Sequence, residues 1–253
     1  MKQSKSERQA RIVAELRAAP ALRVHDLAHR LTVSTETVRR DFAELEERGL
    51  INRTYGGALR PISLEPAIAE REQLFVQERE RIASRAIQLI KDNDILMVGG
   101  GATTLHFARR LAAECNHLTI ITHAFSIAAA LATNPLHKVL MLPGQYDGRE
   151  GLICGPDTID ALQKYRASKA ILGASGITAE GAGDAGIGPG LIYGAMMRRS
   201  AETLILADHS KIDRISVSVY GEWTTRVTLV TDDQLPADLQ THLLVAGTKV
   251  FIA

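Results

Sequence analysis

Apolar positions recur at helical spacing in the first sixty residues, and turn signals interrupt them twice. In the third helical stretch Val38, Phe42 and Leu45 lie at i, i+4 and i+7, so they share one buried face of a helix. Ser34 precedes this stretch and is a good N-cap, because its hydroxyl can accept a hydrogen bond from a backbone N–H of the first turn. The expected elements are helices at residues 6–18, 24–31 and 35–48 and a short β-hairpin at residues 50–58. This order is typical of a winged helix-turn-helix domain.

The pattern changes at residue 94, where short β-branched runs begin to alternate with helical segments. The expected strands are residues 95–98, 118–122, 138–142, 170–173, 203–207, 227–230 and 249–252. The expected helices are residues 104–113, 125–133, 158–165, 192–200 and 236–244. Such alternation predicts an α/β domain with a largely parallel sheet. In these folds ligands bind beyond the carboxyl ends of the strands.

The stretch that joins the two patterns has no clear period. Pro61 and Pro66 favour a connector, and residues 67–81 are heavily charged, which is typical of a solvated helical face. The sequence therefore predicts a winged helix-turn-helix domain at residues 1–60, a linker at residues 61–76 and an α/β domain at residues 77–253.

The composition of the chain indicates its cellular compartment and whether it binds a metal. Cys115 and Cys154 form no metal-binding spacing and no dense disulfide pattern in a chain of 253 residues, which favours a reducing cytoplasm and predicts no metal and no other cofactor. The N-terminus is charged and lacks the apolar core of a signal peptide, and the longest apolar runs are too short to span a bilayer. We therefore expect a cytoplasmic protein that makes no membrane contact.

Charge is distributed unevenly along the chain. The formal net charge is +1, but residues 1–60 carry twelve basic and eight acidic side chains, which leaves a net charge of −3 for the remainder. A basic head on a mildly acidic body fits a domain that binds nucleic acid.

The third helix and the hairpin supply the candidate DNA-binding residues. Hydroxyl and arginine side chains near the start of a short helix suit the major groove of double-stranded DNA, and the hairpin residues would lie near the DNA backbone. Arg39 or Arg40 can instead pair with Asp41 or Glu44. A module that binds another protein is the alternative interpretation. The predicted DNA-binding residues are Ser34, Thr35, Glu36, Thr37, Arg39, Arg40, Arg53 and Tyr55.

Polar residues follow several predicted strands, at the edge of the sheet where a ligand would bind. After the first of these strands a glycine-rich loop opens a helix, and its backbone N–H groups can approach an anion at the positive end of the helix dipole. The loop matches neither the Walker A pattern nor GxGxxG, so a purely structural tight turn remains an alternative. After a later strand, Lys211 can hold a phosphate and Asp208 a hydroxyl. The predicted ligand-binding residues are Gly99, Gly100, Gly101, Ala102, Thr103, Thr104, His123, Gly144, Asp208 and Lys211.

Residues 33–42, 45–51 and 53–58 closely resemble the N-terminal signature of the DeoR family of bacterial transcriptional regulators, most nearly its glycerol-3-phosphate repressor type. Later runs look like the sensor domain of that family, which is similar in fold to ribose-5-phosphate isomerase; they are residues 95–111, 120–122, 171–177 and 207–211. The resemblance implies a repressor of a carbohydrate-catabolism operon that releases operator DNA when a phosphorylated sugar, sugar acid or related metabolite binds. It also implies a homodimer or a homotetramer.

The chain departs from the family where the effector would bind. The family usually has Asp at the position of Gly99, a hydroxyl residue at Ala102, Asn at His123 and Gly at Gln145, and it has a Glu and a Lys where residues 188–194 have neither. Because a carboxylate and a lysine are lost and a histidine is gained, we expect the effector to differ from the one that is common in the family.

An enzyme is the competing interpretation, namely a sugar-phosphate isomerase fused to a DNA-binding head. Such chemistry needs a positioned acid–base pair near the anion. Asp184 and Asp208 remain as possible bases, but the acidic residues of the family at Gly99 and before Ile192 are missing. We therefore expect no catalytic residue and no enzymatic activity.

Overall fold

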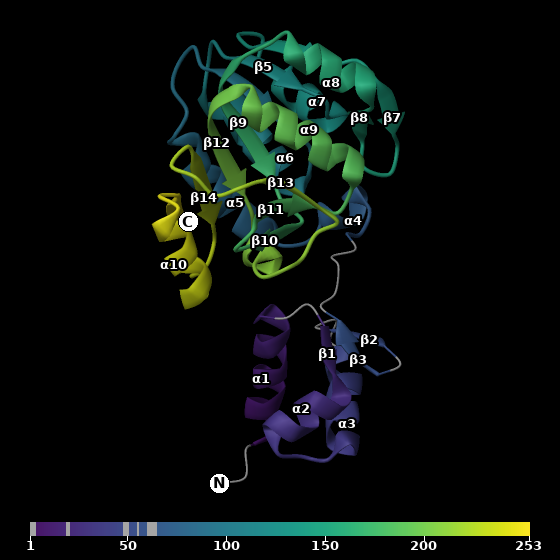
Figure 1. The fold of residues 1–253 in the computed structure, drawn as a ribbon. Coiled ribbons are helices and arrows are strands. Elements are labelled where there is room, and N and C mark those ends of the chain that lie inside the picture. Colours follow the sequence, from purple (N-terminus) through teal and green to yellow (C-terminus); the bar gives the residue numbers. More distant parts are fainter. Residues whose placement is uncertain (1–3, 19–20, 48–50, 55, 60–64) are drawn as a thin grey trace. The chain divides into compact units, whose positions relative to one another are not determined.

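The computed structural model describes residues 4–18, 21–47, 51–54, 56–59 and 65–253 of the chain. The chain forms two compact units, Met1–Ile62 and Ser63–Ala253 (Figure 1). Residues 65–76 of the predicted linker thus belong to the second unit.

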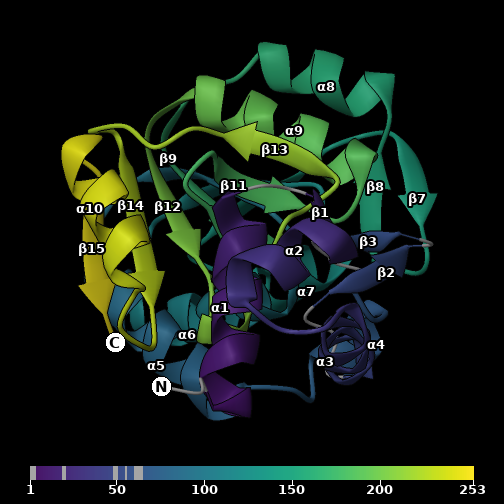
Figure 2. The same cartoon turned by 60° about the horizontal axis from the view of Figure 1, so that its bottom comes forward.

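The first unit packs three helices against a small antiparallel sheet (Figure 2). Thr32 takes a φ of 55°, which ends the second helix and makes the tight turn before the third. The buried face of the third helix carries Val38, Phe42 and Leu45, as their spacing predicts. The winged helix-turn-helix fold is therefore confirmed. Its elements are α1 (Lys5–Ala18), β1 (Ala21–Arg23), α2 (Val24–Leu31), α3 (Thr35–Glu47), β2 (Asn52–Thr54) and β3 (Gly57–Leu59), with the strands in the order β1-β3-β2.

A buried ion pair fastens α1 to α3. Arg8 donates from Nε and Nη2 to the two carboxylate oxygens of Asp41, at 2.5 and 3.0 Å. Lys5 and Gln9 of α1 bond to Glu44 of α3. Because Asp41 is buried and its pairing with Arg8 is bidentate, these contacts fix the orientation of α3 on α1.

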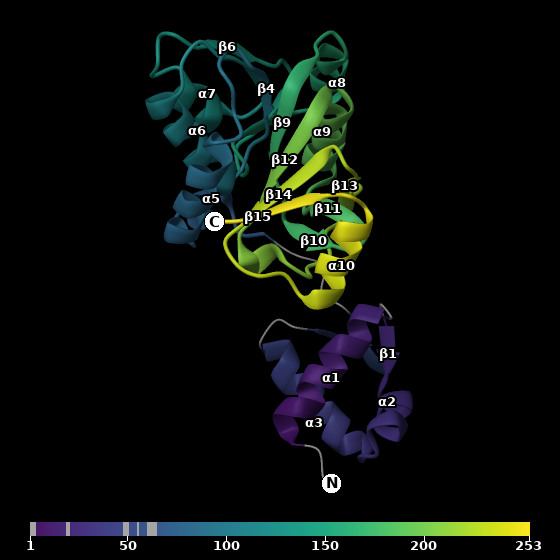
Figure 3. The same cartoon turned by 90° about the vertical axis from the view of Figure 1, so that its left-hand side faces the viewer.

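A seven-stranded parallel sheet forms the centre of the second unit, in the order β15-β14-β12-β9-β4-β5-β6. One apolar core lies between the sheet and α5, α6 and α7, and the other lies between the sheet and α8, α9 and α10 (Figure 3). The predicted α/β domain is confirmed. Each expected strand and helix is present, most of them with shifted ends, while the strands at 95–98 and 249–252 have the predicted bounds. The strands are β4 (Ile95–Val98), β5 (Thr119–Thr122), β6 (Lys138–Met141), β9 (Ala167–Gly173), β12 (Ser200–Leu206), β14 (Val227–Thr231) and β15 (Lys249–Ile252). The helices are α5 (Val76–Ile87), α6 (Ala102–Glu114), α7 (Phe125–Leu131), α8 (Pro156–Gln163), α9 (Ile187–Arg198) and α10 (Ala237–Val245).

Several short elements around this sheet were not expected, because three or four residues are too few to show a period. They are helix α4 (Ile68–Arg71), the hairpin of β7 (Gln145–Asp147) and β8 (Leu152–Cys154), the small sheet of β10 (Gly176–Thr178), β11 (Gly181–Asp184) and β13 (Ser218–Gly221), and the 3-10 turn η1 (His209–Lys211).

The charged residues 67–81 are not simply a solvated helical face, so that interpretation is wrong. Arg79 in α5 is only 2% exposed, and its Nε lies 3.5 Å from Oδ2 of Asp208. Arg71 in α4 is also mostly buried and pairs with two glutamates. Carboxylates outside this charged stretch, at positions 65, 150 and 208, compensate these arginines, which a local charge pattern cannot reveal.

The direction in which strands are added to the sheet reverses at β4. From β4 the chain continues to β5 and β6, then returns to β9 on the other side of β4 and continues to β12, β14 and β15. The loops that follow β4 and β9 therefore diverge and leave a crevice at the carboxyl ends of these strands.

Within the described ranges, no helix combines the length and the apolarity needed to cross a membrane, and no three His, Cys, Asp or Glu side chains are grouped so that they could hold a metal ion.

Candidate functional site

The start of α3 presents polar side chains to solvent. Ser34, Thr35, Glu36, Arg39 and Arg40 are exposed, and Thr37 is half-buried. Ser34 Oγ accepts a hydrogen bond from the backbone N–H of Thr37 at 3.1 Å, so the predicted N-cap is present. The apolar side chains of α3 face the core, and the candidate DNA-binding residues therefore occupy its accessible side.

The two adjacent arginines differ in their contacts. Arg40 Nε lies 3.8 Å from Glu36 Oε1, one helical turn earlier. Asp41 and Glu44 instead form ion pairs with Arg8 and Lys5 of α1. The prediction that an arginine pairs with Asp41 or Glu44 is therefore wrong if that arginine is Arg40. The reason is that Asp41 lies on the face of α3 that packs against α1, while Arg40 points to solvent.

The hairpin supplies one further candidate. Arg53 is exposed on β2, its backbone N–H donates to Glu46 Oε1 at 2.9 Å, and its Nη1 lies 3.7 Å from Glu46 Oε2. These contacts tie the hairpin to α3. Tyr55, also predicted to contact DNA, lies outside the described residues.

A cavity of about 280 Å³ opens at the carboxyl ends of β4 and β9, in the crevice of the sheet. Gly100, Gly101, Ala102, Thr103 and Lys211 of the predicted site line it. The other lining residues that carry charge are Glu65, Arg71, Arg79, Asp147, Arg149, Glu150 and Asp184. Sequence reasoning assigned none of these seven to the effector.

The loop after β4 brings the N-terminus of α6 to the cavity wall. Gly101 is the residue before the helix and takes a φ of 124°, a conformation that favours glycine. Thr104 is fully buried and donates from its hydroxyl to Gly101 O at 3.0 Å, so it braces the loop from behind. The first-turn N–H groups of a helix carry partial positive charge and favour an anion.

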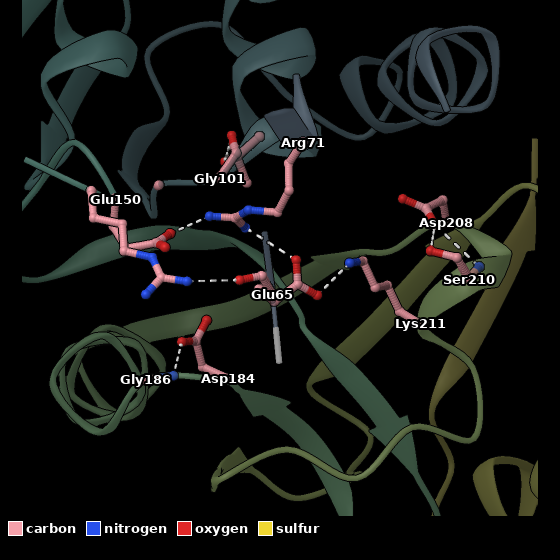
Figure 4. A network of polar contacts seen from close by, with 12 residues as sticks. Glu65, Arg71, Gly101, Glu150, Asp184, Gly186, Asp208, Ser210 and Lys211 are labelled. Carbon is pink, nitrogen blue, oxygen red and sulfur yellow. Dashed lines mark hydrogen bonds and ion pairs between the residues drawn. The ribbon is translucent and has the colours of Figure 1, made fainter. Parts of the chain in front are cut away.

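Cationic side chains reach the same cavity from distant parts of the chain (Figure 4). Arg71 lies between Glu65 and Glu150 and pairs with both. Lys211 Nζ lies 2.5 Å from Glu65 Oε1. Arg149 donates from Nη2 to the backbone oxygen of Glu65 at 3.2 Å. The cavity thus combines a helix N-terminus, several cations and several carboxylates.

Asp208 is not among the lining residues. Its Oδ1 accepts hydrogen bonds from the backbone and the hydroxyl of Ser210, and its Oδ2 faces Arg79 at 3.5 Å. Because it is fully buried, Asp208 orders the turn that carries Lys211 rather than facing the cavity.

Gly99 and His123 form a packed cluster with Tyr193 beside the cavity. A Cβ atom on residue 99 would lie 2.8 Å from Cε1 of Tyr193. Tyr193 donates from its hydroxyl to Gly100 O at 2.9 Å and meets the His123 ring edge-on at 5.7 Å between centroids. His123 Nδ1 donates to Ile153 O at 2.8 Å, and burial lowers the pKa of His123 to about 4. His123 is therefore a neutral packing residue at physiological pH, and Tyr193 fills the space that a larger residue 99 would need.

Gly144 is also not among the residues that line the cavity. It takes a φ of 144°, and a Cβ atom there would meet Oγ1 of Thr158 at 2.3 Å. This glycine allows the close packing of the loop after β6 on the start of α8.

Asp184 is a lining carboxylate with a raised pKa. Burial raises the pKa of Asp184 to about 6, although its Oδ1 accepts a hydrogen bond from Gly186 N–H at 2.8 Å. Sequence reasoning considered Asp184 only as a base for an enzyme.

We expect Asp184→Asn to stabilise the protein at pH 7.5 by about 2 kcal/mol and to leave stability unchanged near pH 4. The raised pKa of Asp184 means that the folded state disfavours the charged form, so stability is lost as pH rises from about 4 through about 6. Asparagine retains the bond to Gly186 and carries no charge. Urea unfolding of both proteins at the two pH values measures this difference, and a variant that is less stable at pH 7.5 would contradict it.

Comparison with known proteins identifies both units of the chain. A family model described as the DeoR-like helix-turn-helix domain matches residues 8–63. A family model described as the DeoR C terminal sensor domain matches residues 75–233.

Several relatives match over most of the chain. The HTH-type transcriptional repressor CsqR of Escherichia coli (strain K12) is 32% identical, over 88% of this chain and 85% of its own. The HTH-type transcriptional repressor GlcR of Bacillus subtilis (strain 168) is 30% identical, over 81% of this chain and 80% of its own. The lactose phosphotransferase system repressor of Lactococcus lactis subsp. lactis is 28% identical, over 92% of each chain. Among solved structures, ribose 5-phosphate isomerase A from Neisseria gonorrhoeae is 18% identical with a TM-score of 0.41, over 54% of this chain and 53% of that one.

The matched family models and relatives are transcriptional regulators and not enzymes, which sets aside the isomerase interpretation. The helix-turn-helix head and the α/β sensor fold agree with that assignment. With matches to both of its units, this chain belongs to the DeoR family of DNA-binding transcriptional repressors.

Proposed function

We propose that this chain represses a carbohydrate-catabolism operon, that α3 and the β2–β3 hairpin bind the operator, and that a phosphorylated sugar or sugar acid in the cavity releases the DNA. The observation that carries the proposal is the composition of the cavity wall. The N-terminus of α6 and the cations Arg71, Arg149 and Lys211 line one space of about 280 Å³. A helix N-terminus and nearby cations favour a phosphate or a carboxylate, and the acidic lining residues can accept hydrogen bonds from sugar hydroxyls.

The relatives support the carbohydrate part of the proposal. The relative from Lactococcus lactis is named a lactose phosphotransferase system repressor, and the family model that matches the second unit describes a sensor domain. A sensor of this kind regulates the head only if the effector binds the two states of the protein with different affinity.

We expect the effector to differ from glycerol 3-phosphate and from the common hexose phosphates. The support is the cluster of Gly99, His123 and Tyr193. In this cluster, aromatic side chains fill the side of the loop after β4 where the family usually has a carboxylate. Tight binding of a common hexose phosphate would contradict this expectation.

The operator should be an inverted or direct repeat. A homodimer or homotetramer of the chain presents at least two copies of α3, and each copy reads one half-site in the major groove.

The decisive experiment measures binding of the purified protein to the DNA upstream of its own gene by fluorescence anisotropy, with and without a panel of phosphorylated sugars and sugar acids. We expect specific binding that one compound abolishes. Specific binding that no compound alters would contradict the proposed class of effector. Absence of specific binding would contradict the proposal that this chain acts as a repressor at this DNA.

Substitution of the adjacent arginines should weaken operator binding unequally. We expect Arg39→Ala to lower operator affinity about ten- to a hundredfold, the range of a lost base contact. Arg40→Ala should cost less, because Glu36 already offsets the charge of Arg40. Both side chains are exposed, so neither variant should change the melting temperature. Equal losses in the anisotropy assay would contradict the different roles of the two arginines.

A further inference from the structure

A carboxylate of the protein itself already occupies the cationic part of the cavity. The Glu65 side chain is 6% exposed, and its Oε1 lies 2.5 Å from Nζ of Lys211. Its Oε2 lies 3.5 Å from Nη1 of Arg71. Figure 4 shows Glu65 between these two cations. The acid group of an effector can bind both cations fully only if the Glu65 carboxylate leaves.

Among the described residues, the contacts of the Glu65 carboxylate leave one of its oxygens without a hydrogen bond. Glu65 Oε2 is buried, yet within the described part of the chain it accepts no hydrogen bond. A buried charged oxygen in this condition carries a desolvation penalty that its ion pair offsets only in part. A phosphate offers more strong acceptor oxygens than a carboxylate and can use more of the donors of Lys211 and Arg71. An anionic effector therefore competes well for this position.

The backbone of residues 65–68 is also bonded to Arg149. Arg149 donates to the backbone oxygen of Glu65 at 3.2 Å, and the Ile68 N–H donates to the backbone oxygen of Arg149 at 3.4 Å. Along the sequence only residues 60–64 separate Glu65 from β3, the last strand of the DNA-binding unit. Loss of the Glu65 contacts thus changes how firmly the sensor unit holds the chain that leads to the head.

We infer that Glu65 is a built-in competitor of the effector: it takes the place of the effector's acid group on Lys211 and Arg71, and an anionic effector displaces it and frees the segment that leads to the DNA-binding unit. The inference rests on the proposed function, because it takes this cavity as the effector site. It supplies the physical link that regulation requires, since the effector binds only the state in which Glu65 has left.

Glu65→Gln tests the inference, because it keeps the shape of the side chain and removes its charge. The probe is inorganic phosphate, titrated calorimetrically into the full-length protein. We expect Glu65→Gln to bind phosphate about tenfold more tightly than the wild type, within the usual range of coupling effects. Glu65→Asp keeps the charge and should stay close to the wild type. Glu70→Gln makes the same charge change at an exposed position of α4 and serves as the matched control.

A second measurement reports on release of the segment. In the wild type, phosphate should accelerate hydrogen exchange of the backbone amides in residues 68–74, and in Glu65→Gln exchange should already be fast without it. Operator affinity of Glu65→Gln without effector should fall about fivefold or more. A melting curve for each variant verifies that it is folded.

The outcomes separate this inference from the proposed function. Equal phosphate affinity of the wild type and Glu65→Gln overturns the inference, and if a sugar of the panel still releases the wild type from DNA, the proposed function stands without it. If phosphate binds neither protein and no panel compound releases the DNA, both are overturned.

Discussion

Arg79→Met is expected to lower the free energy of unfolding of the second unit by about 3–5 kcal/mol. Arg79 is 2% exposed and Asp208 is fully buried, with Arg79 Nε 3.5 Å from Asp208 Oδ2. Arg79 Nη1 also donates to the backbone oxygen of Arg71, so one guanidinium connects α5, α4 and the carboxyl end of β12. Methionine fills a similar volume but leaves the Asp208 carboxylate buried without its cation. Thermal unfolding should show a melting temperature lower by roughly 6–20 °C.

Two further variants decide whether the loss comes from the unpaired charge. Arg81→Met makes the same change two residues later, at a side chain that is 53% exposed and pairs with Asp232, and it should cost only about 1 kcal/mol or less. Arg79→Met combined with Asp208→Asn removes both charges while the amide oxygen can still accept from Ser210, so it should recover more than half of the loss. If the double variant is less stable than Arg79→Met, the ion pair is not the source of the effect.

The long elements of both units could be predicted because each repeats a pattern several times. In α3, Val38, Phe42 and Leu45 specify both the helix and its buried face. In β4 and β5, short apolar runs specify strands that are covered on both sides. By contrast, α4 and the β7–β8 hairpin depend on tertiary contacts with the rest of the unit. Their own few residues do not specify a helix or a hairpin.

The cavity could be predicted only in part, for a physical reason. The glycine-rich loop and Lys211 follow strands, so topology places them at the ligand edge of the sheet. Glu65, Arg71 and Glu150 meet there through contacts between distant parts of the sequence, and a charged run looks the same whether its side chains point to solvent or inward. Asp208 illustrates the converse, since it follows a strand as expected but turns into the core toward Arg79.

Gly99→Asp is expected to destabilise the second unit by about 3–6 kcal/mol. The added Cβ alone would lie 2.8 Å from Cε1 of Tyr193 and 3.0 Å from Cδ2 of Leu172, and overpacking of this kind typically costs about 1–3 kcal/mol. The new carboxylate would also be buried beside the Tyr193 ring, at a further cost of several kcal/mol. Gly148→Asp is the matched control, because a Cβ atom there meets only the Tyr146 ring, at 3.7 Å, on the exposed hairpin.

A second substitution tests whether Gly99 and Tyr193 depend on each other. Tyr193→Lys removes the ring that blocks residue 99 and supplies a cation for the new carboxylate, so Gly99→Asp combined with Tyr193→Lys should be more stable than Gly99→Asp alone by about 1–3 kcal/mol in urea unfolding. The two residues would then act as one unit, in which glycine at position 99 is the consequence of the aromatic cluster and not a separate ligand-binding feature. If the double variant loses the sum of the two single effects, Gly99 and Tyr193 are independent.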